Sequence, residues 1–141
     1  MSLIGTALSV VVDAALGVWL GSIVFFSFVA APTTFDVLGD DAGQVVNAIF
    51  PKYYDFGFGL GAVAFLAAVV AGTLTSFDAV LVALLALVVV GAALDGYARW
   101  VLIPKMERAG DDAFAQYHRQ SVVLNGVTML ALAGAIVAAN L

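Results

Sequence analysis

Residues 79–103 read AVLVALLALVVVGAALDGYARWVLI, and this stretch decides the class of protein to which the chain belongs. Residues 79–94 are all apolar, and the first charge is Asp95. The hydrocarbon core of a bilayer is about 30 Å thick and takes about 20 helical residues to cross. The apolar residues do not alternate with polar ones, which argues against a strand. The stretch therefore predicts a membrane-spanning helix.

Three further segments have the same character. We predict helices over about 3–31, 56–77 and 114–139. Of the 141 residues, 64% are hydrophobic and 11% are charged, whereas soluble domains carry roughly 25% charged residues. Backbone polar groups need internal partners in lipid, so helices are the expected solution. The sequence thus predicts an all-α integral membrane four-helix bundle that forms a single transmembrane domain over 1–141.

The connection between the first two predicted helices is polar. Pro32 is expected to end the first helix, because the residue before a proline is disfavoured in the α region. A short amphipathic helix over about 41–50 is then expected to lie in the membrane interface. The apolar stripe of that helix consists of Val45, Val46, Ile49 and Phe50.

The basic residues all lie on one side of the predicted topology. They are Lys52, Arg99, Lys105, Arg108 and Arg119. Since lysine and arginine favour the cytoplasmic side, we expect a multi-pass protein of the cell membrane with both termini outside. The formal net charge of −5 disfavours nucleic acid as a partner. The long apolar segments make the lipid bilayer the expected partner.

Polar side chains within the helices gather in the cytoplasmic leaflet. His118, Ser121 and Asn125 stand at helical spacing where the fourth helix begins, so they share one face. Asp95 and Arg99 are spaced to pair with each other near the end of the third helix. Two further candidates are expected at the cytoplasmic mouth, Tyr53 and Tyr54. Together these side chains form a candidate site for a small molecule or an ion.

The same cluster also has a structural interpretation. Serine and asparagine in membrane helices form hydrogen bonds between helices that contribute about 0.6–2 kcal/mol. Arginine near a helix end can extend its guanidinium group to the lipid headgroups. The cluster therefore predicts either a latch between the third and fourth helices or a binding or proton-handling site.

The sequence excludes several kinds of metal and catalytic site. The chain has no cysteine and one histidine, so one chain cannot form a zinc site or a haem site with two histidines. It has no P-loop, no dinucleotide-binding glycine motif and no nucleophile elbow. We therefore expect no metal, no cofactor and no enzymatic activity.

Five short motifs carry a family likeness. They are Trp19-Leu20-Gly21, Ala31-Pro32-x-x-Phe35, Phe50-Pro51-Lys52-Tyr53-Tyr54, Pro104-Lys105-Met106 and His118-x-x-Ser121-x-x-x-Asn125. Through them the chain resembles the transmembrane protein 205-like family, small four-helix membrane proteins that form a domain of unknown function in prokaryotes. The resemblance implies a four-helix membrane fold. It also implies structural roles for Trp19, Gly21, Pro32, Phe35, Phe50, Pro51 and Pro104.

These observations leave three functions open. The first is handling or transport of a small solute or ion, not identified by the sequence, through the polar cluster. The second is a non-catalytic scaffold or assembly subunit of a membrane complex. The third is a membrane redox protein associated with haem or quinone. Four helices leave little room for a pore, so transport would need a homo-oligomer, with the glycine-rich first and second helices as contacts.

Overall fold

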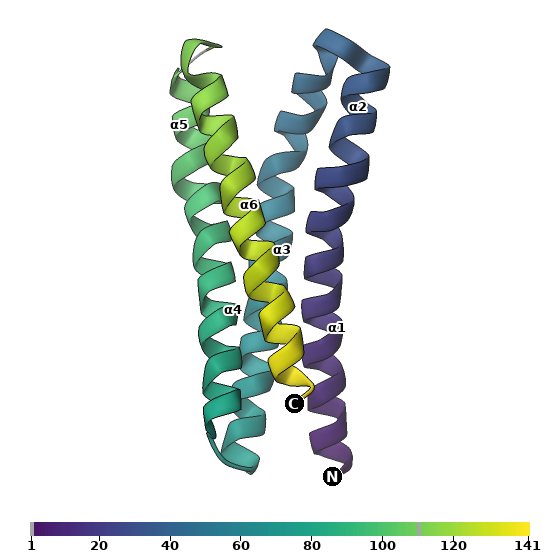
Figure 1. Cartoon of the computed structure of the whole chain (residues 1–141), viewed down its shortest axis with the longest axis vertical. Coiled ribbons are helices and arrows are strands. Elements are labelled where there is room, and N and C mark those ends of the chain that lie inside the picture. The colour runs from purple at the N-terminus through teal and green to yellow at the C-terminus, as the bar shows by residue number, and fades with distance from the viewer. Residues whose placement is uncertain (1, 110) are drawn as a thin grey trace.

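The computed structural model describes residues 2–109 and 111–141, and every element within them is a helix. The chain rises through α1 (Leu3–Phe25), the π-helix η1 (Phe26–Ala30) and α2 (Ala31–Leu38). It turns in the 3₁₀-helix η2 (Gly39–Asp41) and returns through α3 (Ala42–Leu74). It rises again through α4 (Ala79–Tyr97), the π-helix η3 (Ala98–Leu102) and α5 (Ile103–Ala109). The last helix, α6 (Asp111–Ala139), leads back to the C-terminus (Figure 1).

Three helical stretches of the described residues are long and apolar enough to cross a membrane. They are Leu3–Leu74, Ala79–Ala109 and Gln116–Ala139. The first reverses direction between α2 and α3 (Figure 1). Gly39 in this turn has a φ of 55°, a conformation that glycine adopts without steric cost. These stretches are consistent with the membrane protein that the composition predicts.

The prediction that Pro32 ends the first helix is wrong. Helical structure continues to Leu38, because η1 comes just before Pro32. Hydrogen bonds in a π-helix reach one residue further back than in an α-helix, and the last one of η1 joins the Ala31 N–H to the Phe26 carbonyl. Pro32 has no N–H, and it falls in the first turn of α2, where none is needed. The same arrangement recurs where η3 precedes Pro104.

The expected interfacial helix over 41–50 is not a separate element, so this prediction is wrong as well. Its residues belong to the first turns of α3, which continues through Pro51. A proline removes one hydrogen bond of a helix, and tertiary packing can offset that loss. Val46 and Phe50 are buried, and the Phe50 ring lies 5.5 Å from the Phe26 ring of η1. Half of the expected apolar stripe is therefore a packing face inside the protein.

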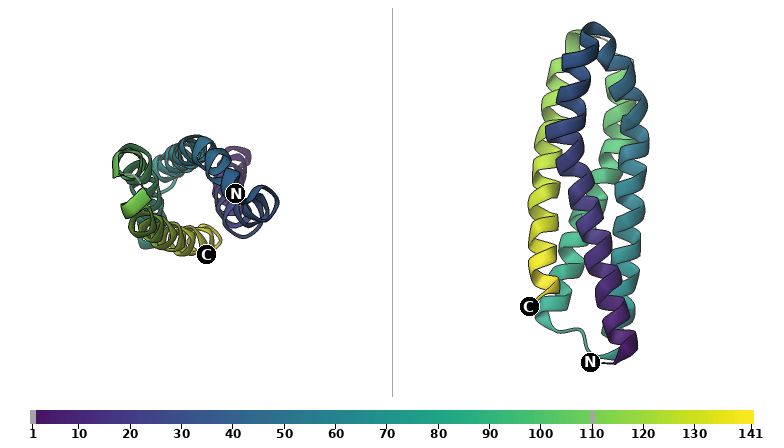
Figure 2. Two further views of the ribbon diagram at one scale, coloured as in Figure 1. Left: turned by 90° about the horizontal axis from the view of Figure 1, so that it is seen from above. Right: turned by 90° about the vertical axis from the view of Figure 1, so that its right-hand side faces the viewer.

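The arrangement of the helices separates the start of α6 from α2. α1 packs against α3 and α6, and α4 also packs against α3 and α6. α6 begins beside α5 and approaches α1 toward its end, so its first turns diverge from α2 (Figures 1 and 2). The centre is filled by large side chains such as Trp19 and Leu132, which are fully buried.

Candidate functional site

A cavity of about 510 Å³ lies between the first half of α6 and the η1–α2 stretch. The first turns of α3 complete its wall. Among the described residues, no lysine, arginine, aspartate or glutamate lines it. Much of the lining is aromatic and comes from Phe26, Phe28, Phe35 and Phe50. An apolar cavity of this size with a few polar groups is the usual form of a small-molecule site.

Three polar side chains of α6 line this cavity. They are His118, Ser121 and Asn125, the stripe that the sequence places on one helix face. Ser121 and Asn125 are buried, whereas His118 is exposed near the start of the helix. Ser27 on η1 and Asn47 on α3 add polar groups from the other walls. The cavity therefore combines a buried polar patch with a histidine at its edge.

Two tyrosines of α3 hydrogen-bond to the buried part of this stripe. The Tyr53 hydroxyl donates to Asn125 Oδ1 over 3.3 Å, and Asn125 Nδ2 donates to the Tyr54 hydroxyl over 3.5 Å. The Tyr54 hydroxyl also lies 3.2 Å from Ser121 Oγ. The four side chains thus form one continuous hydrogen-bond network, which we call the tyrosine–asparagine–serine network. It ties α3 to α6 behind the cavity.

From the sequence, Tyr53 and Tyr54 are expected at the mouth of the site, but the structure places them in the interior. Both are buried, and Tyr54 is only 1% exposed. The Tyr53 ring packs 4.8 Å from Phe26, and the Tyr54 ring stacks 6.1 Å from Phe50. This aromatic packing covers the rings and leaves their hydroxyl groups to the network, as is usual for buried tyrosine.

The expected pair of Asp95 and Arg99 does not form. Arg99 Nε instead donates to Asp55 Oδ1 on α3 over 3.0 Å, and both side chains are partly exposed. Arg99 lies in η3, about one turn after Asp95, so the spacing itself permits the pair. The two side chains nevertheless bond to partners on different helices. Asp95 is 2% exposed and does not line the cavity.

Asp95 is paired with the Trp19 indole, a contact that the sequence patterns did not predict. Trp19 Nε1 donates to Asp95 Oδ2 over 3.0 Å. A Cβ at Gly57 would overlap the Asp95 carboxylate and lie 2.6 Å from Trp19 Nε1. At Gly61 and Gly91 a Cβ would lie 3.0 Å from the indole ring. The three glycines therefore form a slot for the indole between α3 and α4.

A signal for this contact exists in the sequence. A buried tryptophan usually finds an acceptor for its N–H, and Asp95 is the one acid inside the third predicted helix. The partner of Arg99 had no such signal, because Asp55 is one of ten acidic residues and lies 44 positions away.

The motif residues for which the resemblance implied structural roles are distributed over the fold. Trp19 is in the core, and Gly21 faces outward, where an added Cβ would meet nothing within 4 Å. Pro51 lies inside α3, and Pro104 lies near the start of α5. The remaining three, Pro32, Phe35 and Phe50, line the cavity.

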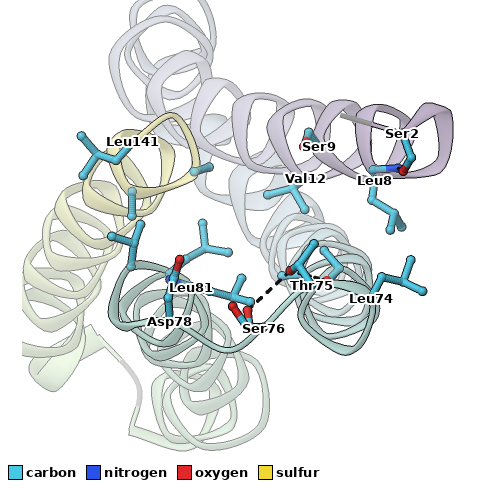
Figure 3. Close-up of a pocket in the computed structure, with 17 residues that line it drawn as sticks. Ser2, Leu8, Ser9, Val12, Leu74, Thr75, Ser76, Asp78, Leu81 and Leu141 are labelled. Carbon is cyan, nitrogen blue, oxygen red and sulfur yellow. Dashed lines mark hydrogen bonds between the residues drawn. The ribbon is translucent and has the colours of Figure 1, made fainter.

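A second cavity of about 480 Å³ lies at the opposite end, near both termini (Figure 3). Three of its polar side chains are engaged at helix ends. Ser2 Oγ accepts the Gly5 N–H, Asp78 Oδ1 accepts the Leu81 N–H, and Thr75 donates to a carbonyl of its own helix. Capping explains these groups without a ligand. We therefore place the candidate site at the first cavity.

No group of three histidine, cysteine, aspartate or glutamate side chains in the described part of the chain could hold a metal ion. The site therefore consists of neutral hydrogen-bonding groups, an imidazole and an apolar wall. Such a site can bind and orient a small molecule by hydrogen bonds and by burial of apolar surface.

A family model described as "Domain of unknown function (DUF4149)" matches residues 14–115. The match covers most of the chain and ends just before the polar stripe of α6. No curated protein and no solved structure matches the chain. The finer likeness to the transmembrane protein 205-like family stays a prediction.

Proposed function

The chain belongs to the DUF4149 family, a domain of unknown function, and we propose that it binds a small, largely apolar molecule in the cavity between α6 and the η1–α2 stretch. In this proposal the protein handles its ligand within the membrane. The tyrosine–asparagine–serine network orients the polar end of the molecule. The aromatic wall covers the apolar remainder.

The observation that carries this proposal is the combination of cavity volume and lining. A volume of about 510 Å³ falls in the range of small-molecule sites. Ser121 and Asn125 are buried at its surface, and their orientation is held by two buried tyrosines. A polar patch held in this way costs little to reorganise when a ligand binds, which favours affinity.

We also propose a topology for this site. Leu3–Leu74 crosses the membrane twice, and Ala79–Ala109 and Gln116–Ala139 cross it once each, so that the bundle has four membrane helices. Both termini lie outside, and η2 and the end of α5 lie in the cytoplasm, where the lysines and arginines gather. The cavity then opens in the cytoplasmic leaflet.

Photolabelling with a medium-chain alkyl diazirine tests the proposed site. Gly43 lines the cavity and has nothing within 4 Å of an added Cβ, so Gly43→Phe fills the cavity with little strain. Gly59→Phe makes the same change on the same helix, at another position with open space. Since Gly59 does not line the cavity, this variant is the matched control.

We expect labelling of the peptide that carries Ser121 and Asn125 to saturate with probe in the wild type and in Gly59→Phe. Gly43→Phe should lose this saturable labelling. Labelling that rises in proportion to the probe in all three proteins would mean that the probe reaches them from bulk lipid only. The proposal would then be wrong.

A scaffold role is the second candidate, and the hydrogen bonds between helices favour it. The Trp19–Asp95 bond ties α1 to α4, and the tyrosine–asparagine–serine network ties α3 to α6. If rigidity is the whole role of the network, Asn125→Leu lowers thermal stability by the same amount with and without the probe. A binding site predicts that the probe's stabilising effect is lost as well.

A further inference from the structure

We infer that the buried polar patch of the cavity is a hydrogen-bond donor site, and that its ligand is an otherwise apolar molecule with a carbonyl oxygen. This inference rests on the proposed function, since it names the chemical class of the molecule that the cavity binds. It follows from the direction in which hydrogen bonds run through the tyrosine–asparagine–serine network.

The first hydrogen bond whose direction is fixed is the one between Tyr53 and Asn125. The amide oxygen of Asn125 has no proton, so Tyr53 must be the donor in the 3.3 Å contact between them. With Oδ1 turned toward Tyr53, the amide nitrogen Nδ2 donates to the hydroxyl oxygen of Tyr54 over 3.5 Å. Tyr54 has thereby accepted one hydrogen bond and still holds its own proton.

The hydroxyl proton of Tyr54 then determines the direction of the hydrogen bond between Tyr54 and Ser121. Its hydroxyl lies 3.2 Å from Ser121 Oγ, and geometry alone allows either group to donate. If Ser121 donated, the Tyr54 proton would be left without an acceptor at a side chain that is 1% exposed. Such a buried, unsatisfied donor is costly. Tyr54 therefore donates to Ser121.

Two protons remain at the end of this chain of bonds. Ser121 keeps its hydroxyl proton, and Asn125 keeps the second proton of Nδ2. Both side chains line the cavity, one helical turn apart. This wall of the cavity consequently offers two donors, which a carbonyl oxygen with two lone pairs can accept together.

The remainder of the lining favours a neutral molecule. Among the described residues that line the cavity there is no acid, lysine or arginine, and His118 lies at the exposed edge, so a charged group placed against Ser121 and Asn125 would be buried without an opposite charge. The aromatic and aliphatic side chains suit a hydrocarbon or ring. A ketone, an ester or a ring carbonyl on such a body satisfies both requirements.

The carbonyl could come from a bilayer lipid ester or from a separate molecule. The test therefore uses nanodiscs of a diether phosphatidylcholine, which has no carbonyl group. Affinity is measured as protection from the alkyl diazirine label. Three protecting molecules of equal chain length are compared: an alkane, a methyl ketone that only accepts hydrogen bonds, and an alkylpyrrole whose N–H donates.

We expect the ketone to protect at least about 2- to 10-fold better than the alkane, which is the range for one neutral hydrogen bond. The alkylpyrrole should do no better than the alkane. Ser121→Ala and Asn125→Leu should each reduce the advantage of the ketone. Ser22→Ala removes a hydroxyl that donates to the Trp19 carbonyl of its own helix and does not line the cavity, so it should leave that advantage unchanged.

The outcomes separate this inference from the proposed function. If the ketone and the alkane protect equally well, and Gly43→Phe abolishes the saturable labelling, the binding site stands and the donor assignment is overturned. Preference for the alkylpyrrole would also overturn it, because the hydrogen bonds would then run in the opposite direction. Absence of saturable labelling would overturn both. The comparison of the three molecules uses the wild-type protein, so it holds even if a variant fails to fold.

Repeating the titration in diester nanodiscs identifies the source of the carbonyl. Weaker protection by the ketone there would mean that the lipid ester occupies the same donors. Unchanged protection would support a separate carbonyl molecule as the ligand. Either result supports a carbonyl-binding wall, provided that the ketone exceeds the alkane in the diether membrane.

Discussion

The indole nitrogen of Trp19 lies 3.0 Å from Asp95 Oδ2, and this hydrogen bond joins α1 to α4 inside the protein. The other oxygen of Asp95 has no hydrogen-bond partner within the described residues, and the side chain is almost fully buried. A buried carboxyl group is therefore held by a single donor. Because the glycine slot leaves no side chain to replace that donor, the packing of this centre depends on the indole.

Trp19→Phe should destabilise the protein strongly. It leaves both oxygens of a buried carboxyl group without a donor, which costs about 1–3 kcal/mol before any loss of packing. Trp100→Phe is the matched control, because Trp100 is exposed and contacts Phe58 only edge to face, at 5.3 Å. Unfolding by SDS in mixed micelles measures the change in the free energy of unfolding for both variants. Equally small effects of the two substitutions would contradict a central role for the Trp19–Asp95 bond.

Two glycine substitutions on α3 should have opposite effects on the free energy of unfolding. Gly57→Ala places a methyl group against the Asp95 carboxylate and the Trp19 indole, so it should destabilise the protein by about 1–3 kcal/mol, as overpacking does. Gly59→Ala has open space and should stabilise the helix by about 0.5–1 kcal/mol. Thermal unfolding in detergent shows whether each variant is less or more stable than the wild type. A stable Gly57→Ala protein would show that the indole slot is wider than described.

The ion pair of Arg99 and Asp55 should contribute little to the free energy of unfolding. Their side chains are 31% and 53% exposed, and exposed ion pairs contribute about 0–1 kcal/mol. Arg99→Gln should therefore change the free energy of unfolding by less than about 1 kcal/mol. If Arg99 were instead the ion-pair partner of the buried Asp95, removing its charge would lower the free energy of unfolding by about 3–5 kcal/mol. A double-mutant cycle of Arg99→Gln with Asp95→Asn should show no coupling, and strong coupling would restore the pair expected from the sequence.

Local patterns in the sequence were sufficient for some features. The long apolar runs predict membrane helices because lipid leaves the backbone few alternatives. Helical spacing alone places His118, Ser121 and Asn125 on one face, and this face lines the cavity. These inferences concern residues within one helix, where distance along the chain determines position in space.

Other features depend on contacts between distant residues or on departures from α-helical geometry. Trp19 and Asp95 are 76 positions apart, and no spacing rule connects them. Arg99 pairs with Asp55, 44 positions away, and no spacing rule favours that partner over Asp95. Pro32 does not end its helix, because the π-helix η1 precedes it. The rule that proline ends a helix assumes α-helical geometry before the proline, and η1 departs from that geometry.

The proposed topology predicts which side of the membrane each turn faces. The chain has no cysteine, so single cysteines can be introduced without a background signal. Asp40 in η2 and Ser76 in the α3–α4 connection are both exposed, and α3 lies between them. On intact cells, a membrane-impermeant maleimide should modify Ser76→Cys, whereas Asp40→Cys should react only after permeabilisation. If both react from the same side, α3 does not cross the membrane, and the cavity cannot open in the leaflet that we propose.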